Sequence, residues 1–150
     1  QSLCARWDCL RAEIAAFLGR AAAEVERRVA IVLCCGDDTE ALRRSAYNGI
    51  VDCASAQATA GGDKACTYGC LGYGSCARVC PVNAIRIENG IAKVDKALCI
   101  ACGKCVAACP RKLIKLVPAA AEIHVLGSSK DKGPAVKKVC GTGCIGCRMC

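Results

Sequence analysis

The residues with the clearest capacity for chemistry are cysteines, of which the chain has 17 in 150 residues. Residues 99–110 read C-I-A-C-G-K-C-V-A-A-C-P, which is the C-x2-C-x2-C-x3-C-P spacing of bacterial ferredoxins. In such a run three thiolates bind one 4Fe-4S cubane, and the thiol before the proline binds a second cluster. Zinc ribbons instead pair two C-x2-C knuckles across a longer spacer. The spacing therefore favours iron–sulfur clusters over zinc.

An irregular version of this run lies upstream and forms an internal repeat. Cys80-Pro81 aligns with Cys109-Pro110 at an offset of 29 positions, with apolar residues following both at matching places. Tyr73 stands where the second ligand is expected, so Cys66 is the expected replacement, although it could instead belong to another site. The swap of the fourth ligand between the two runs then predicts two ligand sets. Cluster A takes Cys66, Cys70, Cys76 and Cys109, and cluster B takes Cys80, Cys99, Cys102 and Cys105.

Other cysteines have weaker spacing signals. Cys144, Cys147 and Cys150 repeat the x2, x2 spacing and predict the start of a further ferredoxin motif, with Cys140 four positions upstream. Cys9 and Cys35 fit equally well as small buried apolar residues. Cys34 and Cys53, together with Cys140 or Cys66, could bind a further cluster. The prediction is at least two 4Fe-4S clusters, with residues for a third or fourth.

Composition limits the class of protein. The hydrophobic fraction is 54%, but alanine and cysteine supply more than half of it, and only 3% of the residues are aromatic. So thin a core indicates that metal centres help to hold the fold. Two cubanes with four thiolates each would lower the formal charge of +8 to about +4, which weakens any case for nucleic acid. No stretch is apolar enough to cross a membrane and no secretory leader is visible. Because the chain begins without Met and stops inside a cysteine motif, we expect it to be part of a longer protein.

Periodicity places the elements that must position these cysteines. Residues 10–28 predict a helix, 29–33 a buried strand, 40–47 a helix capped by Thr39, 52–60 a helix, and 91–95 a strand. A weaker repeat relates residues 30–44 to residues 123–138, each as strand, loop and helix. We expect these two units to lie side by side in one small sheet.

The predicted fold class is α+β, a bacterial two-cluster ferredoxin-like core flanked by small strand-loop-helix units. The expected divisions are a linker helix or the end of a preceding cluster domain (1–22), the first unit (23–64), the ferredoxin-like domain (65–118), the second unit (119–139) and a truncated motif (140–150).

No paired acid and base, activated nucleophile or phosphate-binding loop is present, so the sequence predicts an electron carrier with no catalytic site of its own. The alternatives are a ferredoxin-like module of another multi-subunit reductase or dehydrogenase, or a purely structural metal domain. A basic stretch fits a solvated helix face or a dock for an acidic electron donor; it comprises Lys130, Lys132, Lys137 and Lys138.

Several segments together resemble the B subunit of the Rnf electron transport complex in its longer form from anaerobic bacteria. They are residues 23–32, 47–53, 61–76 and 131–140, and the resemblance covers roughly residues 10–150. It implies an iron–sulfur subunit of a membrane-bound, ion-translocating ferredoxin:NAD oxidoreductase. Such a subunit would be peripheral in this part of its chain, on the cytoplasmic face of the bacterial cell membrane. It would accept electrons from soluble ferredoxin or flavodoxin and contact other subunits. The family often has a cysteine near Gly127, which is absent here.

Overall fold

Two small antiparallel sheets and four short helices form the body of the protein. The computed structural model describes residues 10, 13–19, 26–147 and 149. One sheet pairs β1 with β4, and the other pairs β2 with β3. The strands are β1 (Arg28–Val32), β2 (Ile85–Glu88), β3 (Ile91–Val94) and β4 (Ile114–Pro118). The helices are α2 (Cys53–Ala58), α3 (Ser75–Arg78), α4 (Lys104–Ala108) and α5 (Gly133–Val139).

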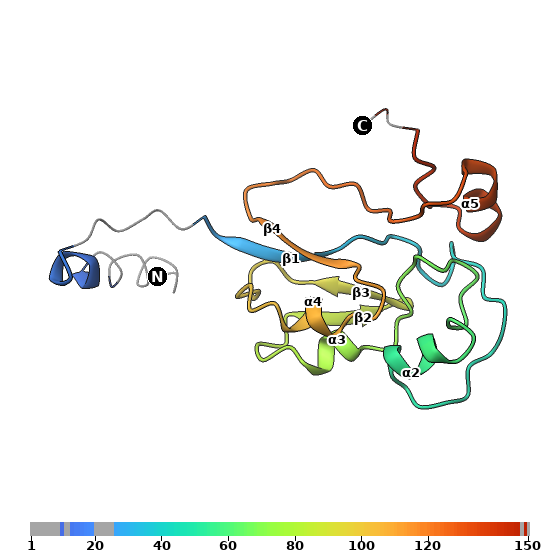
Figure 1. The fold of residues 1–150 in the computed structure, drawn as a ribbon, viewed down its shortest axis with the longest axis horizontal. Coiled ribbons are helices and arrows are strands. Elements are labelled where there is room, and N and C mark those ends of the chain that lie inside the picture. Colours follow the sequence, from blue (N-terminus) through green and yellow to red (C-terminus); the bar gives the residue numbers. More distant parts are fainter. Residues whose placement is uncertain (1–9, 11–12, 20–25, 148, 150) are drawn as a thin grey trace.

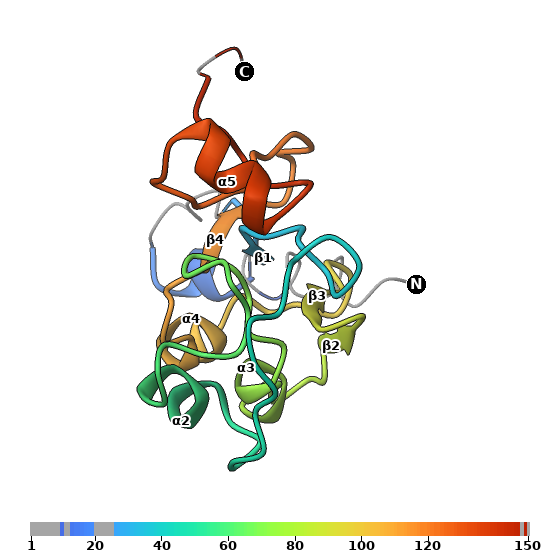
Figure 2. The same ribbon diagram turned by 90° about the vertical axis from the view of Figure 1, so that its right-hand side faces the viewer.

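The β1–β4 sheet lies in the middle of the molecule, which explains its sequence. Residues 29–32 are buried on both faces, as expected for a continuous β-branched run rather than an alternating one. Val32 pairs with Ile114 and Ala30 pairs with Leu116. Figures 1 and 2 show α5 on one side of this sheet, and α3 and α4 on the other. The predicted strand at 29–33 is therefore confirmed to within one residue.

The second sheet is a hairpin with a two-residue turn. Asn89 and Gly90 both have positive φ, 49° and 70°, as a type I′ turn requires. Lys64, only 1% exposed, fixes this turn to the loop after β1. Its Nζ donates to the carbonyl oxygens of Gly90 at 2.8 Å and Gly36 at 3.4 Å. The hairpin and the cysteine-bearing loop at residues 34–36 are thus held together.

The core is small and contains thiols. Ala30, Ile85, Leu113 and Ile114 form one buried cluster with Cys76 and Cys105. These two cysteines occupy the same place in the two halves of the repeat, 29 positions apart. Further cysteines pack against this cluster without being fully buried, namely Cys34, Cys70, Cys80, Cys99 and Cys109. Thiols therefore stand where a larger protein would bury aliphatic side chains.

The helix predicted over 40–47 is wrong. Asp37 Oδ1 accepts hydrogen bonds from the backbone N–H of Thr39 at 3.0 Å and Glu40 at 3.1 Å. This turn is followed by isolated bridges, one from Ala41 to Cys140 and one from Arg43 to Lys64. The backbone groups of this segment are bonded to distant residues, which leaves none for an intrahelical ladder.

The expected pairing of two strand-loop-helix units is also wrong. Residues 123–126 form no strand, and the partner of β1 is β4. The segment still passes the end of β1, where the Ser128 hydroxyl donates to the Leu33 carbonyl at 3.1 Å. Only the helical half of the second unit is present, as α5. The pairing fails because the ferredoxin-like repeat already supplies a strand to β1.

The N-terminal part is described only in pieces. Residues 13–17 are helical, within the predicted helix, but that helix does not extend to 28 because Arg28 already belongs to β1. Cys4, Cys9 and Cys150 lie outside the described residues. Within the described ranges no helix combines the length and apolarity needed to span a bilayer.

Candidate metal centres

The described cysteines other than Cys147 line three separate cavities. Cavity B has about 290 Å³ of empty volume, its open mouth included. Its walls are apolar residues such as Ile85, Val94 and Leu116. The thiols predicted for cluster B all line it, namely Cys80, Cys99, Cys102 and Cys105. The structure thus brings this set together, and its role as a ligand set remains a prediction.

Backbone N–H groups around cavity B point at the sulfur atoms of its cysteines. Ala101 and Gly103 both have positive φ, 56° and 77°, which curls the loop between the cysteines. Backbone N–H groups donate to sulfur on two sides, from Ala30 to Cys99 Sγ at 3.3 Å and from Ala84 to Cys80 Sγ at 3.3 Å. Such N–H donors to sulfur tune the potential of a bound cluster.

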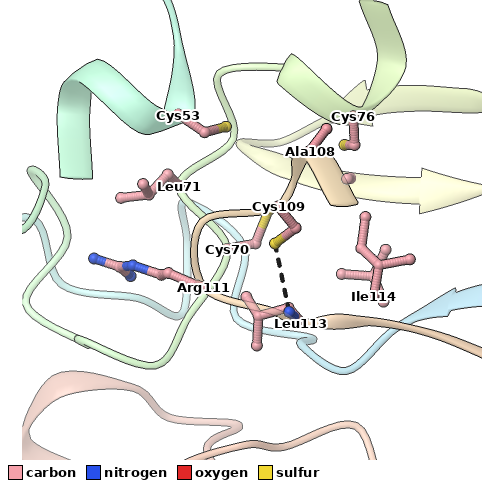
Figure 3. Close-up of a pocket in the computed structure, with 11 residues that line it drawn as sticks. Cys53, Cys70, Leu71, Cys76, Ala108, Cys109, Arg111, Leu113 and Ile114 are labelled. Atoms are coloured by element: carbon pink, nitrogen blue, oxygen red, sulfur yellow. Dashed lines mark hydrogen bonds between the residues drawn. The ribbon is translucent and has the colours of Figure 1, made fainter. Parts of the chain in front are cut away.

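Cavity A differs from the predicted arrangement by one residue. It has about 370 Å³ of empty volume and is lined by Leu71, Leu113 and Ile114 among others. Figure 3 shows thiols from four separate segments facing it, and they are Cys53, Cys70, Cys76 and Cys109. Cys66, the replacement expected from its position in the chain, does not line this cavity. The structure places Cys53 there instead, a residue 17 positions before Cys70.

The thiol before each proline lines the cavity of the other run, which is the placement that the predicted exchange of the fourth ligand requires. Cys80, before Pro81, lines cavity B, and Cys109, before Pro110, lines cavity A. A backbone N–H from Leu113 donates to Cys109 Sγ at 3.4 Å. Each cavity therefore takes one thiol from the other half of the repeat.

The electrostatics of both cavities disfavour bare thiolates. Burial raises the pKa of Cys76 to about 12, and the neighbouring thiols of Cys70, Cys53 and Cys109 raise it further. Burial likewise raises the pKa of Cys105, again with its neighbours Cys99 and Cys102 acting in the same direction. Four thiolates could share such an apolar cavity only with positive charge among them, which is what the iron of a cluster supplies.

Cys53 reaches cavity A through a polar network at the start of α2. Asp52 caps this helix by accepting from the N–H of Ala54 at 2.9 Å and of Ser55 at 3.1 Å. The Ser75 hydroxyl donates to Asp52 at 2.7 Å and accepts from the Cys53 N–H at 2.8 Å. Since Ser75 begins α3, which carries Cys76, this network joins two thiols of cavity A. No spacing rule predicts it; the only sequence signal was a thiol beside an acidic helix start.

Cys66 lies in a third cavity, cavity C, with about 320 Å³ of empty volume. The thiols along its wall are Cys34, Cys35, Cys66, Cys140 and Cys144. Cys147 is exposed and lines none of the three cavities. Cys150, the last member of that predicted motif, is outside the described residues.

Arg111 is the functional candidate that the sequence did not indicate. Its guanidinium donates to the carbonyl oxygens of Cys66 at 2.8 Å, Gly69 at 2.6 Å and Gly61, and to Gln57 Oε1 at 2.7 Å. It lines cavity A and binds the loop that carries Cys66. Its position next to Pro110 was a weak signal for such a role.

Among the described residues no three cysteine, histidine or acidic side chains converge closely enough to hold a single metal ion. The described thiols other than Cys147 instead lie around three separate cavities.

Comparisons with known proteins add independent findings. Residues 61–110 match a family described as a 4Fe-4S dicluster domain. The B subunit of the proton-translocating ferredoxin:NAD(+) oxidoreductase complex of Clostridium ljungdahlii is 44% identical over 133 residues, covering 88% of this chain and 47% of that protein. The B subunit of the Na(+)-translocating ferredoxin:NAD(+) oxidoreductase complex of Acetobacterium woodii is 45% identical over 134 residues, covering 89% of this chain and 40% of that protein. The B subunit of the ion-translocating oxidoreductase complex of Methanosarcina acetivorans is 41% identical over 139 residues, covering 92% of this chain and 53% of that protein. The chain thus spans about half the length of the curated relatives it matches.

Proposed function

Because the chain is homologous over about nine-tenths of its length to the B subunits of ion-translocating ferredoxin:NAD(+) oxidoreductase complexes, we propose that it is an electron relay. The resemblance to this family predicted from the sequence is confirmed, and the 4Fe-4S dicluster domain confirms the ferredoxin-like class with mixed helix and strand. The relay would carry single electrons between 4Fe-4S clusters and transform no substrate itself.

The observation that carries this proposal is the exchange of the fourth thiol between two four-cysteine cavities. Cavity A would hold one cluster through Cys53, Cys70, Cys76 and Cys109, and cavity B another through Cys80, Cys99, Cys102 and Cys105. Each cluster would supply a one-electron redox couple. The chain would exclude water with apolar walls, donate N–H groups to sulfur, and hold both sites rigidly against one buried core.

The partners of the relay follow from the relatives. Since those proteins are subunits of complexes, we propose that this chain joins other subunits at the cytoplasmic face of a membrane, peripheral in the part seen here. Soluble ferredoxin, or flavodoxin, would be its electron donor. The exposed lysines of α5 and the loop before it offer a basic surface to such an acidic protein.

Metal analysis of the anaerobically purified chain tests the relay. We expect at least about eight iron and eight acid-labile sulfide per chain, as two cubanes require. Dithionite or reduced ferredoxin should then give EPR signals of two interacting reduced cubanes. Zinc without sulfide in anaerobic material would contradict the proposal. A tightly held flavin or molybdenum protein on purification from the source would favour the alternative, a ferredoxin-like module of another reductase or dehydrogenase.

Replacement of Asp52 by alanine should weaken cavity A selectively, because it removes the cap and the link to Ser75. The pKa of Asp52 is lowered to about 2, above all by the Ser75 hydroxyl and next by the Ser55 N–H. The pKa of Asp52 in the folded protein lies below the ordinary value of 3.8. The stabilisation that ionised Asp52 gives the fold is therefore complete above about pH 4 and is lost as the pH falls toward 2. EPR of reduced samples, after brief acid exposure and return to neutral pH, measures how much of each cluster survives.

In the wild-type chain the ratio of the cavity A signal to the cavity B signal should fall across that interval. In Asp52→Ala the ratio should already be low at neutral pH and change little with acid. Cavity B, which makes no contact with Asp52, is the internal control for general acid lability. An unchanged ratio in the variant would show that the network does not position Cys53.

A further inference from the structure

Lys64 is a buried cation whose charge is only partly compensated. Among the residues that the structure describes, it is the only lysine or arginine whose side chain is buried. Lysine is rarely buried without a partner, because an ammonium group loses favourable hydration when it leaves water. The partner here is Asp38, whose Oδ1 lies 3.5 Å from Nζ and whose side chain is 38% exposed. Arg43 binds the same oxygen more closely, at 2.7 Å, so Asp38 cannot neutralise Lys64 fully.

The ammonium group lies behind one wall of cavity A. Its Nζ donates to the Gly90 carbonyl oxygen at 2.8 Å. That carbonyl group packs against Gly72, where an added Cβ atom would lie 2.4 Å from the oxygen. Leu71, next to Gly72, and Ala92, two residues after Gly90, both line cavity A. A single hydrogen-bonded carbonyl group therefore connects Lys64 to backbone that adjoins the lining of the cavity.

Cys70 is a thiol of cavity A that experiences this charge. Burial raises the pKa of the Cys70 thiol, whereas the backbone N–H groups of Ala92 and Gly72 and the charge of Lys64 lower it. N–H donors and a nearby cation both favour a negatively charged sulfur. Lys64 contributes in both ways, since it carries the charge and also holds the hairpin that places Ala92. In cavity B, burial and then the thiols of the same motif raise the pKa of Cys105.

We propose that Lys64 is a buried cation that raises the reduction potential of the cluster in cavity A and leaves that of cavity B unchanged. This role rests on the proposed relay, because it requires a cluster in each cavity. Reduction adds one negative charge to a cluster, and a cation in a weakly polarisable interior stabilises that charge more than a solvated cation does. Lys64 would thus bias the electron toward cavity A.

Two substitutions of opposite charge separate this role from a purely structural one. Lys64→Met removes the positive charge with little change in side-chain length. It should shift the one-electron equilibrium of the cavity A cluster about tenfold toward the oxidised form, which lowers the potential by ~60 mV. Asp38→Asn removes the negative charge of the ion pair and should raise the same potential, by less because Asp38 is partly exposed. A loosened structure gives no reason for shifts of opposite sign.

Redox titration of the anaerobically reconstituted chain, followed by EPR at low and high salt, measures both potentials. The cavity B cluster is the internal control, since its signal shows that the chain has folded and its potential should not move. Lys93→Met is the matched control, because it removes an exposed lysine from the same hairpin, where Lys93 pairs with Glu88 at 2.9 Å. Its effect should be small and should vanish at high salt, whereas the effect of Lys64→Met should persist.

A second variant covers the case in which Lys64→Met does not take up the cavity A cluster. Lys64→Gln keeps a hydrogen-bond donor but no charge, and it should lower the potential in the same way. If neither variant holds the cluster, Asp38→Asn decides alone, and an unchanged or lowered potential in that variant overturns the proposal.

The remaining outcomes distinguish this proposal from the relay. If the wild type holds both clusters but Lys64→Met and Asp38→Asn leave the cavity A potential unchanged, or shift it in the same direction, Lys64 does not tune the cluster and the relay stands. Equal shifts of both potentials in Lys64→Met would also overturn the proposal, because the effect would not be local. The absence of either cluster from the wild-type chain would contradict the relay itself.

Discussion

Cys53→Ser should abolish one of the two ferredoxin-like clusters and leave the other intact. Cys53 is one of the thiols that line cavity A, and it influences the pKa of Cys76 more strongly than Cys109 does. A serine hydroxyl is a much poorer ligand for iron than a thiolate, since its proton is far harder to remove. The expected result is loss of the cavity A signal in the EPR spectrum of the reduced protein, with the cavity B signal retained but no longer split by its neighbour.

Cys66→Ser is the matched control, because the order of cysteines in the chain favours Cys66 as the ligand at this place. The structure puts Cys66 in cavity C, so this variant should retain the cavity A signal. The opposite outcome, in which Cys66→Ser loses cluster A and Cys53→Ser keeps it, would restore the ligand set predicted from the spacing.

Arg111→Gln should destabilise cavities A and C together. The guanidinium donates to three carbonyl oxygens in the loop of residues 61–69 and to Gln57 in α2. Glutamine is too short to reach all of these oxygens, so at least two charge-assisted hydrogen bonds are lost. Their loss should lower the free energy of unfolding by about 3 kcal/mol or more. That free energy corresponds to roughly a hundredfold in an equilibrium constant. Because cluster loss makes unfolding irreversible, the rate of bleaching in denaturant is the quantity to measure.

The same substitution removes a positive charge beside several thiols. Burial lowers the pKa of Arg111, while the thiols of Cys66 and Cys70 act in the opposite direction because of their proximity. Without this cation the reduced, more negative cluster in cavity A is less stabilised. Its reduction potential should fall by on the order of 60 mV, a tenfold change in a one-electron equilibrium. Redox titration followed by EPR measures this shift.

Lys115→Gln is the control for both effects, since it makes the same change of charge on an exposed strand residue of β4. It should bleach at the wild-type rate and keep the wild-type potential. If Arg111→Gln behaved like this control, the contacts of Arg111 would be without consequence for the clusters.

The clusters would also explain how so thin a core holds its shape. The buried apolar residues are mostly alanine, valine and isoleucine, and no buried aromatic side chain lies among the described residues. Each cavity joins segments distant in the sequence, such as Cys53 and Cys109 in cavity A. Metal ligation of these thiols would be coupled to folding, since the sites do not exist in the unfolded chain.

Local spacing by itself determined the ferredoxin-like repeat, the set of thiols around cavity B and the exchange of Cys80 and Cys109. Those features depend on a few neighbouring residues, because the spacing of the motif fixes the turns between its cysteines. Ala101 and Gly103 have positive φ in these turns. The strand at 29–33 and the helix beginning at Cys53 could also be predicted from neighbouring residues. The strand depends on a short apolar run, and the helix depends on its capping residue.

Only the tertiary structure decided that Cys53 lines cavity A, that Cys66 lines cavity C with Cys34 and Cys140, and that Arg111 lines cavity A while donating to the carbonyl oxygen of Cys66. It also replaced the helix expected at 40–47 with bridges to distant residues. These outcomes depend on contacts between segments tens of residues apart. No periodicity encodes such contacts, because any thiol that the folded chain brings to a cavity can serve there, whatever its position in the sequence.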